Sequence, residues 1–383
     1  MDFHLTEEQR AVQEMVHDFA EKEIVPHATE IDQTDEFPAE IFRKMGEQGL
    51  MGLPFPEEYG GGGADAMSQA LAVEEISWAS GSVGLTYAAH LSLGCAPIYN
   101  FGTEDQKKEW LTPLARGEAL GALALTEPKG GSDLAGSVST TAVLKGNEWI
   151  INGSKMYVTS GAIARSINVL CMTDKTKGHR GLSLIIVPRG APGLVVGKLE
   201  EKMGLHGSLT TQVFLEDCRV PKGNLLGAEG DGFKQAMITL DGGRIGIGAM
   251  ALGLGRAALE ASLKYAQERQ AFGQPISNFE AIQWMIADSA MELEASRLLI
   301  AKAAYLKDRH QRFSTEAAMA KLNASEAADR ACSKAIQIHG GAGYLRDFPV
   351  ERYYRDNRLT LIGEGTNEIL RMVIARSILK EVG

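Results

Sequence analysis

Residues 138–153 read Val-Ser-Thr-Thr-Ala-Val-Leu-Lys-Gly-Asn-Glu-Trp-Ile-Ile-Asn-Gly, and they mark a change in the hydrophobic period of the chain. The residues at every second position from Val138 to Leu144 are Val, Thr, Ala and Leu, a spacing that predicts a half-buried strand. Gly146-Asn147 predicts a turn, and Asn152-Gly153 after an apolar run predicts a hairpin. The stretch therefore predicts antiparallel strands in the middle of the chain.

More strand-like runs follow this stretch, and no helical period separates them. They lie at 168–172, 182–187, 194–196 and 212–215. Parallel neighbours need a long crossover, usually a helix, whereas antiparallel neighbours need only a short turn. We therefore predict a middle domain over residues 119–228 that forms a mostly antiparallel β sandwich or barrel.

The segments on both sides of this domain have helical patterns instead. Thr6-Glu7-Glu8-Gln9 and Thr103-Glu104-Asp105-Gln106 are capping boxes, in which the first and fourth residues satisfy each other's backbone N–H groups. Helical spacing also recurs near 66–78 and 82–100. These patterns predict an N-terminal α-helical domain over residues 1–118.

The C-terminal part returns to a helical period in unusually long segments. The candidate helices are 232–269, 277–309, 315–340 and 366–380. Long helices with Ala and Gly on their faces predict a four-helix bundle over residues 229–383, whose outer surface could serve oligomerisation. The fold class is thus α+β and multi-domain, in the order α, β, α.

Composition excludes several classes of partner. The chain has 383 residues, with 39 Lys plus Arg against 49 Asp plus Glu, for a net charge of −10. Such a surface repels a polyphosphate backbone, so we expect no nucleic acid. Four scattered Cys form no CxxC pair, which favours a reducing compartment over disulfides or structural zinc. The apolar runs are shorter than the roughly 18 to 20 residues that a membrane span needs, and the opening acidic segment does not resemble a secretory signal.

Two glycine strings fit the loose dinucleotide-binding pattern, at 246–251 and 253–258. Both lie within a helical period instead of between a strand and a helix, so we interpret them as close helix packing. The eight His include no HExxH or other paired spacing, so no metal site is predicted. His339, beside two glycines, is interpreted as a packing or capping residue.

Three loops contain residues that are suited to ligand binding or catalysis. Leu125–Asp133 combines hydroxyls with glycines that let a ligand approach the backbone, although an ordinary interdomain loop fits its composition too. Residues 337–344 end a helix in glycines whose N–H groups could face phosphates. In 362–368, Glu364 stands between two glycines, accessible to a substrate, although its spacing also suits a charge at a helix N-terminus.

Together these segments resemble the acyl-CoA dehydrogenase family of flavoproteins over essentially the whole chain. The resemblance rests on Glu57–Gly61, the Thr126–Asp133 loop, Arg269–Gly273, the glycine pattern from Gln337 to Asp347 with Arg352 and Asp356 beyond it, and Glu364-Gly365-Thr366. The C-terminal half is most similar to short-chain members, and Val83–Pro97 is similar to isovaleryl-type members.

The resemblance implies a homotetramer, arranged as a dimer of dimers, with FAD between the β domain and the helical bundle. The cofactor-binding residues that it implies are Leu123, Leu125, Thr126, Gly131, Ser132, Tyr157, Val158, Thr159, Arg269, Phe272, Glu280, Gln337, Ile338, Gly340, Gly341, Thr366, Asn367 and Glu368. Arg269, Glu280 and the residues from Gln337 to Gly341 would reach FAD across a subunit boundary. The implied substrate contacts are Ser132, Asp241, Gly242, Gly243, Arg244 and Gly365.

The resemblance also implies a reaction, in which Glu364 takes the α-proton of an acyl-CoA thioester while a β-hydride passes to flavin N5. Burial under the acyl chain would raise the pKa of this carboxyl group toward a useful range. The backbone N–H of Glu364 and a ribityl hydroxyl of FAD would stabilise the enolate oxygen. In some relatives the base lies at the position of Gly243. Glycine cannot accept a proton, so this alternative base is absent here and Glu364 is the expected base.

The expected product is a trans-2-enoyl-CoA, with electrons passed to an electron-transferring flavoprotein. An acyl-CoA oxidase on the same scaffold and a non-catalytic flavoprotein scaffold stay as alternatives. The location implied is the cytoplasm in a prokaryote, or the mitochondrial matrix after removal of a transit peptide in a eukaryote. Two residues depart from the family pattern: Glu280, which Ser277-Asn-Phe-Glu280 also explains as a capping box, and Gly363, which widens the pocket wall.

Overall fold

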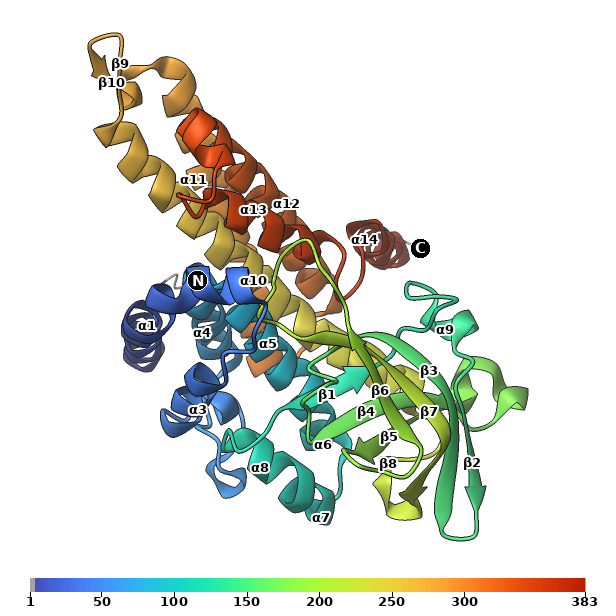
Figure 1. The fold of residues 1–383 in the computed structure, drawn as a ribbon. Helices are drawn as coiled ribbons and strands as arrows, with labels where there is room; N and C mark the ends of the chain where they lie inside the picture. Colours follow the sequence, from blue (N-terminus) through green and yellow to red (C-terminus); the bar gives the residue numbers. More distant parts are fainter. Residues whose placement is uncertain (1–3, 383) are drawn as a thin grey trace.

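The computed structural model describes residues 4–382. Along the chain, N-terminal helices are followed by a sheet and then by long C-terminal helices, and the sheet lies to one side of the helices (Figure 1). The N-terminal helices are α1 (Glu7–Phe19), α2 (Ala28–Thr34), α3 (Ala39–Glu47), α4 (Ala66–Ala79), α5 (Gly81–Ala89), α6 (Ala96–Phe101), α7 (Glu104–Gln106) and α8 (Thr112–Ala115). Both capping boxes are confirmed: the Thr6 hydroxyl accepts from Gln9 N at 3.1 Å, and Thr103 accepts from Gln106 N at 3.3 Å. The predicted helical character of this segment is correct.

The middle segment forms one mixed sheet. Its strands are β1 (Gly121–Ala124), β2 (Thr141–Lys145), β3 (Glu148–Thr159), β4 (Ser166–Met172), β5 (Leu182–Pro188), β6 (Leu194–Leu199), β7 (Thr210–Pro221) and β8 (Leu225–Leu226), with the short helix α9 (Leu134–Ser137) after β1. They pair in the order β6–β7–β3–β2–β4–β5–β8, and β1 pairs with β4 in parallel. Most pairs are antiparallel, as predicted, but the order is open at both ends, so the barrel alternative is wrong.

The turn at Gly146-Asn147 is confirmed, because Lys145 pairs with Glu148 across it. The hairpin predicted at Asn152-Gly153 is wrong, since β3 continues through these residues with a bulge in its pairing to β7. Asn152 explains why the strand is not broken: its side chain bonds Asp217 on β7 through Nδ2 at 3.0 Å and accepts Asp217 N at 2.8 Å. A Cβ on Gly153 would lie 2.4 Å from Thr140 Oγ1, so this glycine permits close packing instead of a turn.

The C-terminal segment consists of α10 (Gly232–Glu268), α11 (Glu280–Asp308), α12 (Ser314–His339), α13 (Val350–Asn357) and α14 (Asn367–Val382). Helices α10, α11 and α12 pack on one another, and α14 packs on α12. A small hairpin, β9 (Gln270–Ala271) and β10 (Gln274–Pro275), lies at the end of the long helices remote from the sheet (Figure 1). The four predicted long helices are present, whereas α13 was not predicted.

The glycine strings in α10 lie at helix contacts, as interpreted. A Cβ on Gly253 would be 2.3 Å from the carbonyl oxygen of Glu74 on α4, and one on Gly255 would be 3.2 Å from Ala328 on α12. Helix α10 is long and apolar enough to cross a membrane by length and composition, but 78% of its most apolar window is buried inside the protein. A helix buried in a protein core can have the same length and apolar composition, so these two properties are weak evidence for a membrane span.

The capping box predicted at Ser277–Glu280 is wrong. Helix α11 begins at Glu280, its N-cap is Phe279, and no side chain of the described residues caps it. Ser277 instead belongs to a preceding 3₁₀ turn, Ile276–Asn278. Glu280 is therefore an exposed carboxylate in the first helical position, where it suits the helix dipole.

Candidate active site

Glu364 lies in the short loop between a 3₁₀ turn, Arg358–Leu361, and the start of α14. Its backbone has φ 54°, in the left-handed region that side chains other than glycine avoid. Its Oε2 atom is buried and has no hydrogen-bond partner among residues 4–382. An unpaired buried carboxylate oxygen on a strained backbone is a feature that folded proteins retain at functional sites.

Room for this carboxylate is provided by a glycine on the facing helix. A Cβ on Gly243 of α10 would lie 1.9 Å from Glu364 Oε2 and 2.8 Å from its carboxyl carbon. No larger residue could occupy position 243 with the carboxylate where it is. The sequence therefore combines an acid at 364 with the absence of a side chain at 243.

The charge state of Glu364 is set by opposing effects. Burial raises the pKa of this carboxyl group to about 7, against the smaller lowering effect of Arg244 and Lys321. Arg244 is held in place by Asp241, since its Nη1 donates to Asp241 Oδ1 at 2.6 Å. Asp241 Oδ2 also accepts from the Ser314 hydroxyl at 2.5 Å. The result is a carboxylate that can exchange a proton near neutral pH.

Of the predicted substrate contacts, Gly243, Arg244 and Gly365 lie close to Glu364, and Asp241 is connected to it through Arg244. A Cβ on Gly365 would be 3.7 Å from Arg244 Nη2, so the loop and α10 are close together. The structure thus brings together residues 241–244 of one helix and 364–365 of a loop that follows about 120 residues later.

The loop at residues 125–133 is anchored by a buried ion pair that the sequence analysis did not identify. Lys155 Nζ lies 2.8 Å from Glu127 Oε1, and both side chains are almost completely buried. Lys155 also donates to Leu125 O at 3.1 Å, while Glu127 accepts from the backbone N–H groups of Ser139 and Thr140. Burial disfavours the charge, but Lys155 and these hydrogen bonds hold the pKa of Glu127 well below its usual range. The pair fixes the loop against β3.

Hydroxyls of this region are available to a ligand. Thr126, Ser132 and Thr159 make no side-chain hydrogen bond to any residue between 4 and 382, and none is fully buried. Tyr157 is 64% exposed, with φ 56°. A Cβ on Gly131 would be 3.3 Å from the Thr126 side chain, so a larger residue here would push the Thr126 side chain by a few tenths of an ångström.

Two of the predicted cofactor residues in this region face inward. The side chains of Leu123 and Val158 are 9% and 1% exposed and belong to the apolar cores. Only their backbone groups can face a ligand. Leu125 is partly buried and packs against the main core.

A second group of predicted cofactor residues lies at the far end of the long helices, on the β9–β10 hairpin and the adjoining helix ends (Figure 1). This group comprises Arg269, Phe272, Glu280, Gln337, Ile338, Gly340 and Gly341. Phe272 is 96% exposed, and all the others except Ile338 are also exposed. Within one chain they do not join the loop at 125–133. His339 between them is buried and stacks on Tyr265 at 4.2 Å, which confirms its packing role.

The third group, Thr366, Asn367 and Glu368, begins α14. The Asn367 side chain is buried and already bonded, since its Nδ2 donates to Ser325 Oγ at 3.0 Å. It therefore has no free amide for a cofactor. Glu368 is exposed, and its own backbone N–H and Thr366 lower its pKa, as suits an acid in the first turn of a helix.

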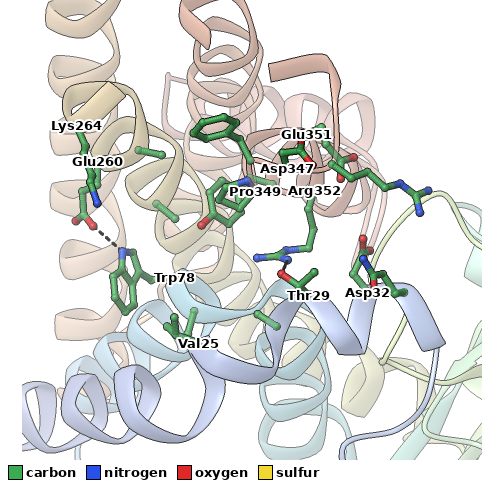
Figure 2. A pocket seen from close by; sticks show the side chains of 18 residues that line it. Val25, Thr29, Asp32, Trp78, Glu260, Lys264, Asp347, Pro349, Glu351 and Arg352 are labelled. Carbon is green, nitrogen blue, oxygen red and sulfur yellow. Dashed lines mark hydrogen bonds between the residues drawn. The ribbon is translucent and has the colours of Figure 1, made fainter. Parts of the chain in front are cut away.

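A separate cavity of about 410 Å³ lies between the N-terminal helices, α10 and the segment that leads into α13 (Figure 2). Trp78 Nε1 donates to Glu260 there at 2.7 Å, and Arg352 Nη1 donates to Thr29 at 3.1 Å. None of the predicted site residues lines it. Because these polar groups bond one another, we interpret this cavity as a groove between packed elements and Glu364 as the centre of the site.

Comparisons with known proteins agree with this order of helical, β and helical domains. Family models match residues 6–118 (acyl-CoA dehydrogenase, N-terminal domain), 122–218 (middle domain) and 230–379 (C-terminal domain). The chain belongs to the acyl-CoA dehydrogenase family. This acyl-CoA dehydrogenase is 57% identical over 381 residues to a probable acyl-CoA dehydrogenase of Bacillus subtilis (strain 168), with 99% of this chain and 100% of that protein covered.

Further relatives narrow the class. The short-chain specific acyl-CoA dehydrogenase of Clostridium acetobutylicum is 47% identical over 380 residues, with 99% of this chain and 100% of that protein covered. A chain in a structure described as "Electron transferring flavoprotein of Acidaminococcus fermentans" superposes with a TM-score of 0.98 at 49% identity, covering 99% of this chain and 100% of that one. The protein is thus an acyl-CoA dehydrogenase of the short-chain type, which confirms the resemblance read from its sequence.

Proposed function

We propose that this acyl-CoA dehydrogenase binds FAD and converts a short or branched acyl-CoA into a trans-2-enoyl-CoA, with Glu364 as the base. The observation that carries the proposal is the Glu364 carboxylate, whose Oε2 is buried and unpartnered in the space left by Gly243. Burial raises its pKa to about 7. A group with a pKa near the working pH is suited to general-base catalysis.

The residues around the β domain fit FAD. Free hydroxyls at Thr126, Ser132 and Thr159 can bond the carbonyls and nitrogens of a flavin ring, and the exposed Tyr157 can cover part of it. Arg269 is exposed and forms no ion pair with any residue between 4 and 382, so it is available to an anionic part of the cofactor. When bound, FAD supplies the acceptor for the β-hydride.

The chain itself handles the proton and the negative charge. Glu364 takes the α-proton, while Arg244 and Lys321 favour the ionised carboxylate before reaction. The backbone N–H of Glu364 makes no hydrogen bond within the part of the chain that the structure describes, so it is free to donate to the thioester oxygen. Charge that develops on that oxygen is stabilised by such a preorganised donor.

The proposal predicts that the purified yellow protein loses its flavin absorbance near roughly 450 nm when mixed with butyryl-CoA without oxygen. The loss of absorbance should be complete with one equivalent of butyryl-CoA per flavin. Octanoyl-CoA should bleach the flavin less efficiently. A spectrum that does not change with any of butyryl, isobutyryl, isovaleryl or 2-methylbutyryl thioesters contradicts the proposal and favours a scaffold role. Rapid peroxide formation in air favours the oxidase alternative.

The pKa of Glu364 predicts a pH dependence for the free enzyme. Only the carboxylate form accepts a proton, and burial places its pKa at about 7. Below this value kcat/KM for butyryl-CoA should fall about tenfold per pH unit, and above it kcat/KM should level off. Steady-state rates between pH 5.5 and pH 9, about the range in which such a group titrates, measure this. A profile that is flat through neutral pH and falls only near the ordinary Glu range would contradict the assignment.

The partners are part of the proposal. An electron-transferring flavoprotein as electron acceptor is supported by the similar chain in the Acidaminococcus fermentans structure. A homotetramer is supported by an exposed apolar stripe on α11, in which Trp284, Met291, Leu298 and Tyr305 recur every seven residues and are between 44% and 65% exposed. A cytoplasmic or matrix location is supported by the four Cys, which are all buried free thiols.

A further inference from the structure

Lys321 on α12 is a buried lysine whose contacts are unusual. Its side chain is completely buried, a state that disfavours a charged ammonium group unless partners compensate. Nζ donates to Gly365 O at 2.9 Å and to Asn367 Oδ1 at 2.9 Å. No carboxylate of residues 4–382 lies within ion-pair distance of it. Both bonds therefore go to the loop that follows Glu364.

The two bonds form a clamp on that loop. Ser325, one turn further along α12, accepts from Asn367 Nδ2 at 3.0 Å, so Lys321 and Ser325 hold the Asn367 side chain from one helix. Lys321 also holds the carbonyl of Gly365, the residue next to the base. Glu364 has φ 54°, a conformation that persists only when its surroundings impose it. The clamp supplies such surroundings.

The position of the ammonium group does not suit a helix-capping role. Asn367 is the first residue of α14, and the N-terminus of a helix carries a partial positive charge that disfavours a nearby cation. Neutral hydrogen-bond acceptors or acidic groups stabilise this end of a helix better, because its free backbone N–H groups are donors. A buried cation at this end therefore needs another reason, and the neighbouring carboxylate of Glu364 provides one.

We propose that Lys321 is a positioning residue for the base: it clamps Gly365 and Asn367 so that the Glu364 carboxylate faces the substrate, and its charge favours the ionised form. This inference rests on the proposed function of Glu364. It gives Lys321 of α12 a role in the proton transfer, although no sequence motif and no expected cofactor contact includes this residue.

The charged groups near Lys321 agree with this role. Glu364, Glu368 and Glu326 favour its ammonium form, while burial and Arg244 oppose it and bring its pKa to about 8. Glu364 in turn faces two cations, Arg244 and Lys321. Arg244 is bound directly by Asp241, whereas the hydrogen-bond partners of Lys321 among residues 4–382 are all neutral. Of the two cations, Lys321 is therefore the one whose charge is not neutralised by a bound carboxylate in this part of the chain.

The test compares Lys321→Met with Lys334→Met in the FAD-loaded protein. Lys334 lies on the same helix and pairs with Asp288, away from the loop. In Lys321→Met the pKa seen in the pH profile of kcat/KM should rise by about one unit, the lower end of what losing a nearby opposite charge produces. At pH 6.5 kcat/KM should fall about eightfold, because a rise of the pKa from about 7 by one unit lowers the ionised fraction of Glu364 by roughly that factor. Lys334→Met should match the wild type.

A second measurement needs no turnover. Hydrogen exchange of residues 362–368 in the substrate-free protein should be faster in Lys321→Met and unchanged in Lys334→Met, because the clamp is lost only in the first. Lys321→Gln, which retains a donor without the charge, should shift the pH profile with less effect on exchange. Lys321→Gln also tests the effect of the charge if Lys321→Met does not fold.

Two results separate this inference from the proposed function. If Glu364→Gln is inactive but folded Lys321 variants keep the wild-type pH profile and loop exchange, the role of Lys321 is overturned and that of Glu364 stands. If Glu364→Gln keeps its activity, the proposed function itself fails. If Lys321→Met has wild-type hydrogen exchange in residues 362–368 but a shifted pH profile of kcat/KM, the effect of the Lys321 charge on Glu364 is supported. The same result overturns the role of Lys321 as a clamp on the loop.

Discussion

Glu364→Gln should lower kcat/KM for butyryl-CoA at pH 8 by at least about a hundredfold, within the range that general bases contribute. Gln has nearly the same size and shape as Glu, so the space left by Gly243 stays filled. An amide cannot accept the α-proton, and the charge that Arg244 and Lys321 favour is lost. The rate of flavin bleaching after anaerobic mixing with butyryl-CoA measures this step directly.

The stability of the same variant distinguishes a catalytic role from a structural one. Burial raises the folded-state pKa of Glu364 to about 7, above its ordinary value of 4.5, so the ionised group disfavours the folded state as pH rises through this interval. Removing the charge should therefore leave Tm at pH 8 equal or higher, with unchanged flavin content. Glu294→Gln, an exposed carboxylate on α11, should change neither activity nor Tm by much. Equal bleaching rates in Glu364→Gln and the wild type would refute the assignment of Glu364 as the base.

The sequence predicts those parts of this site that lie in short, unusual segments. Glu364 was found because two glycines flank it, and the loop at 125–133 because Pro and Gly exclude regular structure there. Both signals are local. The substrate contacts at 241–244 came only from the resemblance, because in a helical period Gly243 looks like any packing glycine.

Residues that act through distant partners could not be predicted in this way. Lys321 lies 44 positions before Gly365, and Lys155 lies 28 positions after Glu127. A lone Lys in a helix or strand usually reaches solvent, so its burial depends on which segments the fold brings beside it. The wrong prediction at Asn152-Gly153 has a related cause, since pairing of β3 with β7, in which Asn152 bonds Asp217 65 positions later, prevailed over a local turn preference.

The second large effect concerns Gly243, where an added methyl group should separate activity from stability. Gly243→Ala would place a Cβ 1.9 Å from Glu364 Oε2, so the carboxylate must move. The atom it meets is the end of a flexible side chain, and Ala in a helix interior is favoured over Gly by roughly 1 kcal/mol. We therefore expect Tm to be unchanged or higher, while kcat/KM falls about a hundredfold, as a misplacement of about 1 Å can cause.

Gly246→Ala on the same helix is the matched control. Its Cβ would be 3.6 Å from the Ala88 side chain, an ordinary contact, so it gains the same helix preference without touching Glu364. Activity near the wild type in Gly246→Ala, together with a large loss in Gly243→Ala, would show that the space at 243 serves the carboxylate and not the packing of α10. Full activity in Gly243→Ala would instead mean that proton transfer does not need the carboxylate at this place, and the geometric basis for assigning the base would be lost.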